Sequence, residues 1–101
     1  MLCKLFLFSK LYKMNKEEIL NYIEWICREN GYMLYRIYKE KGDIIKVDIK
    51  QKYKNLPRIE YSQKDGKARY NLSGEMSSEG LVKANNVIGK LLKINLSYIL
   101  D

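Results

Sequence analysis

The sequence predicts a two-layer α+β sandwich, in which a helix, four antiparallel strands and a second helix follow one another along the chain. Three observations predict it: an apolar stripe with helical spacing toward each end, period-two alternation between them, and short glycine-containing turns within the alternating region. Each helix has one apolar stripe and each strand one apolar face. We therefore expect both helices to cover the same sheet face, which leaves the other face to solvent or a partner.

The first helix is predicted to begin after Asn15 and to end before Gly31. Asn15 is a favourable N-cap, Glu18 follows three residues later as in a capping box, and Gly31 suits the C-terminal turn. Apolar side chains recur between them at helical spacing, at Ile19, Leu20, Ile23, Ile26 and Cys27. This stripe predicts the face that packs on the sheet.

Four strands are predicted in two hairpins. Alternation marks residues 32–39, 44–51, 57–62 and 67–73. Gly42 lies in the first turn and Asp65-Gly66 in the second, where positive φ angles are needed. The alternation predicts these side chains to point at the helices: Tyr35, Ile37, Val47, Ile49, Ile59, Tyr61, Tyr70 and Leu72.

The second helix is predicted to begin at Ser77 or Ser78, and its apolar stripe comprises Leu81, Ala84, Ile88, Leu91 and Leu92. Residues 94–101 fit either a continuation of this helix or a final strand. Residues 1–13 are predicted to be an N-terminal extension or an additional edge strand, and residues 14–101 a single domain.

Composition predicts a folded cytoplasmic protein. The chain has 101 residues, 47% of them hydrophobic, and its two cysteines occur without a secretory context, which is typical of reduced thiols. No apolar run is long enough for a signal peptide or a membrane span, so we expect no membrane partner. The absence of histidine removes the commonest metal ligand, and we expect neither metal nor cofactor.

Positive charge is concentrated in the middle of the sequence. The chain carries a net charge of +7, and residues 36–69 hold eleven Lys and Arg against five Asp and Glu, which is +6. Cations neutralise phosphates, and tyrosines on a sheet stack on unpaired bases. We therefore predict a non-catalytic nucleic-acid-binding protein that prefers single strands, with DNA or RNA and monomer or dimer left open. The predicted binding residues are Arg36, Tyr38, Lys46, Lys50, Lys52, Tyr53, Lys54, Arg58, Lys67 and Arg69.

Two other functions fit the sequence. The protein could be a phage or mobile-element inhibitor that binds an acidic surface of a host defence or nucleic-acid-processing protein. A lesser alternative is a Mg²⁺-dependent nuclease, in which Asp43 and Asp48 bind the metal and Lys50 orients the attacking water. The gap of five residues between the two acids is short for such a site, and Asp-x-Lys arises easily in a lysine-rich chain.

Overall fold

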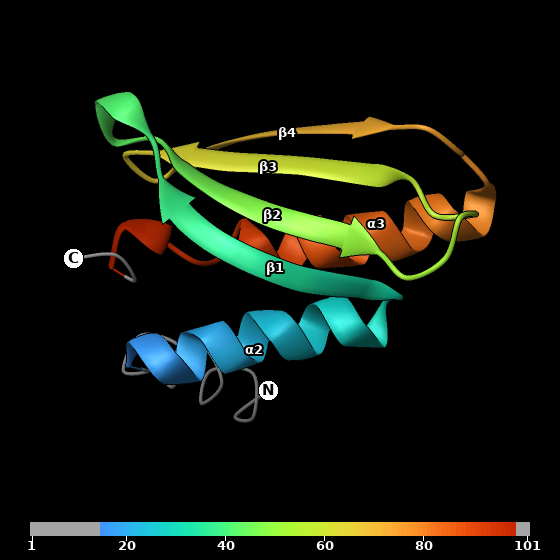
Figure 1. Ribbon diagram of the computed structural model, residues 1–101, viewed down its shortest axis with the longest axis horizontal. Coiled ribbons are helices and arrows are strands. Elements are labelled where there is room, and N and C mark those ends of the chain that lie inside the picture. Colours follow the sequence, from blue (N-terminus) through green and yellow to red (C-terminus); the bar gives the residue numbers. More distant parts are fainter. Residues whose placement is uncertain (1–14, 99–101) are drawn as a thin grey trace, which may run out of the picture.

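The computed structural model describes residues 15–98 and has the predicted order of helix, four strands and helix (Figure 1). Its elements are α2 (Lys16–Glu29), β1 (Tyr32–Lys39), β2 (Ile45–Gln51), β3 (Arg58–Lys64), β4 (Lys67–Ser73) and α3 (Ser78–Leu91). Short 3-10 turns follow β1, at Lys41–Asp43, and α3, at Leu96–Tyr98. The prediction for residues 1–13 lies outside the described residues. Within residues 15–98, neither helix is long and apolar enough to cross a membrane.

The four strands form one antiparallel sheet in the order β1-β2-β3-β4. Between β2 and β3, however, the register runs only from Ile45 to Asp48, although β2 continues to Gln51. Beyond Asp48 the two hairpins diverge, as Figure 1 shows toward the end of β2. The sheet therefore consists of two hairpins that are joined closely at one end and separated at the other.

Both helices cover one face of this sheet. One buried cluster combines Ile23 and Ile26 of α2, Val87, Ile88 and Leu91 of α3, and the strand residues Ile45, Val47, Ile59 and Tyr61. Figure 1 shows α2 beside β1 and α3 behind β2. The Asn86 side-chain amide of α3 donates to Asn30 Oδ1 just after α2, at 3.1 Å. The predicted two-layer sandwich is confirmed, and no helix among residues 15–98 lies on the opposite sheet face.

Local signals set the helix and turn boundaries. Asn15 Oδ1 accepts from the Glu18 N–H at 2.8 Å, and Ser77 Oγ accepts from the Gly80 N–H at 3.0 Å, so Ser77 rather than Ser78 is the N-cap. Asp65 and Gly66 have φ angles of 53° and 78°, as expected for a two-residue hairpin turn. Because this turn is tight, β3 extends two residues beyond its predicted end at position 62.

The predicted burial of Tyr35 is wrong. The pairing of β1 with β2 shifts between Leu34 and Arg36, which makes Tyr35 an unpaired bulge residue, and its exposure is 67%. The physical reason is the odd spacing of Leu34 and Ile37, since two side chains three residues apart cannot share a face of a regular strand. The bulge lets both apolar side chains face the core and turns Tyr35 outward.

Tyr70 is also more exposed than its predicted position implies. It lies opposite Tyr61, hence on the helix side of the sheet, but β4 is the outer strand and Tyr70 is 53% exposed. Tyr70 therefore points to the predicted side of the sheet, but the prediction that it is buried there is wrong.

A buried glutamine ties β3 to the segment after α3. Gln63 is 3% exposed; its Nε2 donates to the Ile94 carbonyl at 2.7 Å, and its Oε1 accepts from the Leu96 N–H at 3.0 Å. Ile94 and Leu96 are themselves buried. The part of the C-terminal tail up to residue 98 is therefore neither a longer helix nor a strand, but a packed turn.

The free energy of unfolding is expected to fall as pH rises from about 9 to 12. Burial, and then the nearby charge of Glu24, raise the pKa of the Cys27 thiol from 9.0 to about 12; burial also raises the pKa of Tyr32 from 10.0 to about 12. The folded state therefore keeps protons that the unfolded chain loses, so each group lowers stability by up to about 1.4 kcal/mol per pH unit in its window.

Urea unfolding at a series of pH values, with reductant present, measures this decline. The control is the double variant Cys27→Ala, Tyr32→Phe, in which the slope above pH 9 is expected to be shallower. An equal slope in the variant would contradict the assignment.

Candidate nucleic-acid interface

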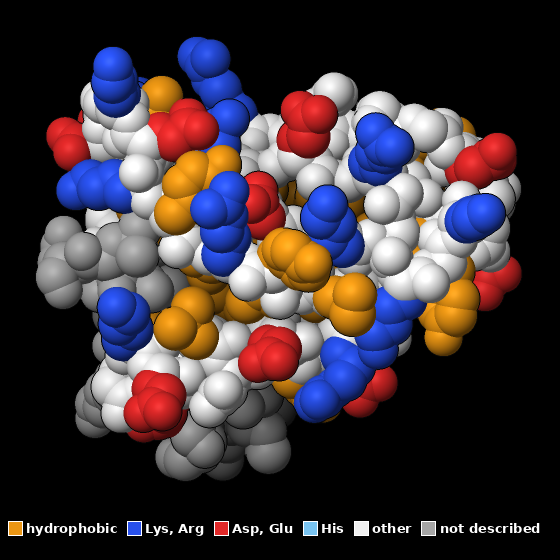
Figure 2. Space-filling view, viewed as in Figure 1, with side chains coloured by type: hydrophobic (Ala, Val, Ile, Leu, Met, Phe, Trp, Pro, Cys, Tyr) orange, Lys and Arg blue, Asp and Glu red, His pale blue; other side chains and the backbone are white. Residues whose placement is uncertain are grey.

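The sheet face away from the helices carries most of the predicted binding residues. Lys46, Asp48 and Lys50 of β2 alternate with core residues, and the register places Glu60 and Ser62 of β3 beside them. Seven cations belong to this face: Arg36, Lys46, Lys50, Arg58, Lys64, Lys67 and Arg69. Lys64 was not predicted, because the expected strand ended at Ser62. Figure 2 shows Lys and Arg side chains spread over this face, with acidic and apolar groups between them.

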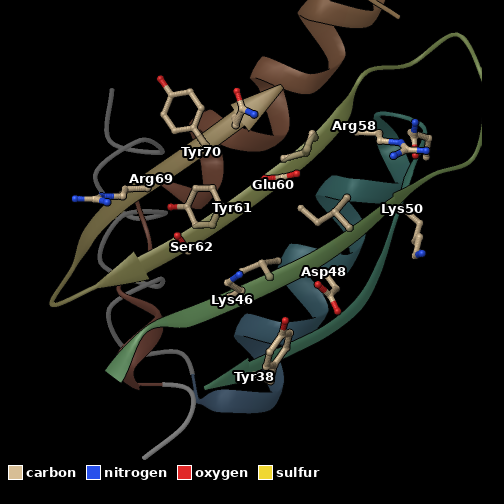
Figure 3. Close-up of a pocket in the computed structure, with 15 residues that line it drawn as sticks. Tyr38, Lys46, Asp48, Lys50, Arg58, Glu60, Tyr61, Ser62, Arg69 and Tyr70 are labelled. Atoms are coloured by element: carbon tan, nitrogen blue, oxygen red, sulfur yellow. The ribbon is translucent and has the colours of Figure 1, made fainter. Parts of the chain in front are cut away.

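The open face is hollowed. A cavity of about 600 Å³, open to solvent, is lined by all four strands, including Tyr38, Lys46, Arg58, Arg69 and Asn71 (Figure 3). It spans the point beyond which β2 and β3 diverge, and side chains of both hairpins border it. A cavity of this volume is within the range of small-molecule sites, so it has room for a nucleotide-sized group.

Two carboxylates lie within the basic face. Asp48 and Glu60 are directly opposite each other on β2 and β3, and both line the hollow. Asp48 Oδ2 also accepts from Arg36 Nε at 2.7 Å, and this hydrogen bond raises the pKa of the Arg36 guanidinium. The Arg36 guanidinium lies 4.3 Å from the centre of the Tyr38 ring, so it covers one side of that ring.

Most cations of the face have no acidic partner among the described residues. Within residues 15–98, the ion pairs of the seven face cations involve only Arg36, with Asp48, and Lys46, whose Nζ is 3.6 Å from Glu40 Oε2. Lys50 Nζ lies 5.4 Å from the centre of the Tyr35 ring. The five cations without an acidic partner in this part of the chain are Lys50, Arg58, Lys64, Lys67 and Arg69.

Tyr35 is the aromatic residue that the sequence analysis missed at this face. The bulge exposes its ring beside Lys50, and Tyr38 lies three residues along the same strand. The odd spacing of Leu34 and Ile37 is the signal that could have found it. An exposed ring next to a lysine suits both base stacking and phosphate contact.

The predicted residues Lys52, Tyr53 and Lys54 are exposed but lie at one end of the sheet rather than in the hollow. The Lys52 N–H donates to the Gly31 carbonyl at 2.9 Å, next to the beginning of β1. A Cβ atom on Gly31 would lie 3.3 Å from the Tyr53 ring, so this tyrosine packs over the glycine. The other seven predicted residues share the open face.

The residues of the nuclease alternative do not come together. Asp43 belongs to the β1–β2 turn, where its Oδ1 is 3.3 Å from Lys39 Nζ, whereas Asp48 is in the middle of β2. Five residues of extended chain span about 16 Å, too far for two ligands of one ion. Among residues 15–98 no group of three or more His, Cys, Asp or Glu side chains is placed to hold a metal.

The site therefore consists of a hollowed basic face with the exposed Tyr35 and the half-buried Tyr38 along β1 and a carboxylate pair inside it. Comparison of the chain with protein-family models, with curated proteins and with solved structures finds no match. Function must accordingly be inferred from the chemistry of this face.

Proposed function

We propose that the protein binds nucleic acid through the open face of its sheet, and that it prefers single strands. The observation that carries the proposal is the charge of this face, which has seven Lys and Arg against two carboxylates. Five of these cations have no acidic partner within residues 15–98 and are available to phosphates. Each phosphate contact releases condensed counterions, which gives affinity without sequence preference.

The preference for single strands rests on the tyrosines and the shape of the face. Tyr35 is exposed, and Tyr38 has one ring side covered by Arg36 and lines the hollow. Only unpaired bases offer their faces for stacking on such rings. The hollow accepts a base-sized group, whereas a duplex would present mainly phosphates and groove edges.

The carboxylate pair gives the bound strand an orientation. Asp48 and Glu60 repel phosphates from the middle of the hollow, so the sugar–phosphate backbone follows the surrounding cations and the bases turn inward. Carboxylates accept hydrogen bonds from base amino groups, such as N4 of cytosine. We therefore expect a modest preference for bases that carry an amino group.

Fluorescence anisotropy with labelled single- and double-stranded DNA and RNA over a range of salt concentrations tests the proposal. If the five unpaired cations contact phosphates, log K for a single strand falls with log salt with a slope of about −3.5, at about 0.7 per phosphate. The control is the neutral polymer polyvinylpyrrolidone, which lacks phosphates.

Failure to bind any nucleic acid at low salt would overturn the proposal and favour an acidic protein surface as the partner. The same incubations are run with Mg²⁺ and with chelator. Metal-dependent cleavage that Asp48→Asn abolishes would favour the nuclease alternative instead.

A further inference from the structure

β4 leaves one edge of the sheet open. It pairs with β3 over seven consecutive residues without a bulge, and within residues 15–98 no strand pairs with its other side. Figure 1 shows β4 at the outside of the sheet, whereas β1, at the opposite edge, lies beside α2 and contains the bulge. A long, regular edge strand presents a row of backbone donors and acceptors that can pair with another strand.

Exposed apolar side chains lie on the helix side of the sheet, on the edge strand β4 and just after α3. Tyr70 of β4 is 53% exposed and Leu92, just after α3, is 48% exposed. Leu81, Asn85 and Leu92, which are half-buried or exposed, recur at helical spacing on one flank of α3. That flank points away from α2, because Asn86 on the other flank contacts Asn30. A strand that paired with the β4 edge would therefore meet the exposed Tyr70 ring on the helix side of the sheet.

We infer that this edge binds a second copy of the same chain, with the two β4 strands antiparallel and centred on Tyr70. The sequence of β4 is self-complementary in this register, since its cations lie in its first half and neutral residues in its second. All seven residues then find partners: Lys67 faces Ser73, Ala68 faces Leu72 and Arg69 faces Asn71. A shift of the centre to Arg69 would place two arginines opposite each other, which is unfavourable.

Charge complementarity supports the same register. Glu60 lies opposite Asn71 within one chain, and Arg69 of the second copy would lie on the far side of Asn71. Two strand spacings separate Glu60 from that arginine, about 10 Å between backbones, which the two long side chains can bridge from both sides. Glu60 has no cationic partner within residues 15–98, and the twofold symmetry creates this pair twice.

The net charge of +7 per chain opposes association, and salt screens this repulsion over about 10 Å at 0.1 M. The dimer is therefore expected to strengthen between low and moderate salt, whereas nucleic-acid binding weakens over the same range. The opposite salt dependence distinguishes self-association from nucleic-acid binding in experiments. Neither proposal requires the other. A dimer would join two open faces into one eight-stranded surface.

Sedimentation equilibrium of the full chain from micromolar to millimolar concentration tests the inference. The mass is expected to rise from 12.0 kDa toward twice that value. Asn71→Lys places a lysine opposite Arg69 of the second copy, and the two symmetric contacts are expected to weaken the dimer about tenfold. The fold of the single chain is expected to tolerate this lysine, because residue 71 lies opposite Glu60 on β3 and the two charges have opposite sign. The matched control is Asn21→Lys, which adds the same charge at an exposed position of α2.

A disulfide tests the register itself. Tyr70→Cys, in a Cys3→Ser background, puts two thiols on the twofold axis, where directly opposed residues have Cα atoms about 4.5–5.5 Å apart, within the range of a disulfide. Lys50→Cys in the same background, on the open face, is expected not to cross-link. A monomer at every concentration, a dimer that Asn71→Lys leaves unchanged, or equal cross-linking by both cysteine variants would overturn the inference.

Discussion

Replacing Lys50, Arg58 and Lys64 together by glutamate is expected to weaken the binding of a single-stranded oligonucleotide about a hundredfold at 0.1 M salt. All three are exposed, lie on the open face and have no acidic partner within residues 15–98. The loss of three phosphate contacts removes about 2 units from the slope of log K against log salt. The counterion contribution to the affinity vanishes near 1 M salt. At 0.1 M, which is tenfold lower, a slope that is smaller by about 2 units therefore corresponds to an affinity lower by about 10².

The matched control replaces Arg28, Lys90 and Lys93, which are exposed on or just after the helices. Each triple substitution changes the charge by −6, from +7 to +1, so an effect of net charge alone would be equal in both variants. Anisotropy titrations over salt compare the two. Equal losses would mean that the open face is not the binding surface. None of the six residues belongs to β4, so the test does not depend on self-association through that strand.

Replacing Gln63 by leucine is expected to lower the free energy of unfolding by about 3–5 kcal/mol. Leucine has a similar volume but leaves the Leu96 N–H and the Ile94 carbonyl buried without partners. The Tyr61 hydroxyl also loses the Gln63 amide, which lies 3.0 Å away. Each unsatisfied buried group costs about 1–3 kcal/mol, so the sum is large for a domain of this size.

Urea unfolding followed by circular dichroism measures this loss. Ser62→Ala, at the neighbouring half-exposed position of β3, is expected to change stability by less than about 0.5 kcal/mol. A loss below 1 kcal/mol for Gln63→Leu would show that water replaces the amide at these backbone groups. The prediction concerns stability alone and would stand if the functional proposal failed.

The sequence alone could predict those parts of this fold that depend on neighbours along the chain. The helix N-cap at Asn15, the start of the second helix at Ser77 or Ser78, the Asp65-Gly66 turn and the alternation of β2 all follow from interactions between residues a few positions apart. Since a strand with one apolar face has a polar one, the alternation also predicted six of the seven cations of the open face, all but Lys64.

The tertiary structure decided the features that join distant residues. The register of β2 and β3 makes Asp48 a neighbour of Glu60, and the bulge turns Tyr35 outward because Leu34 and Ile37 both pack against the core. Gln63 looked like part of a polar turn in the sequence, and it is buried because its backbone partners come from residues 31 and 33 positions later. Cross-strand register and burial depend on how the whole chain packs, so no local pattern specified them.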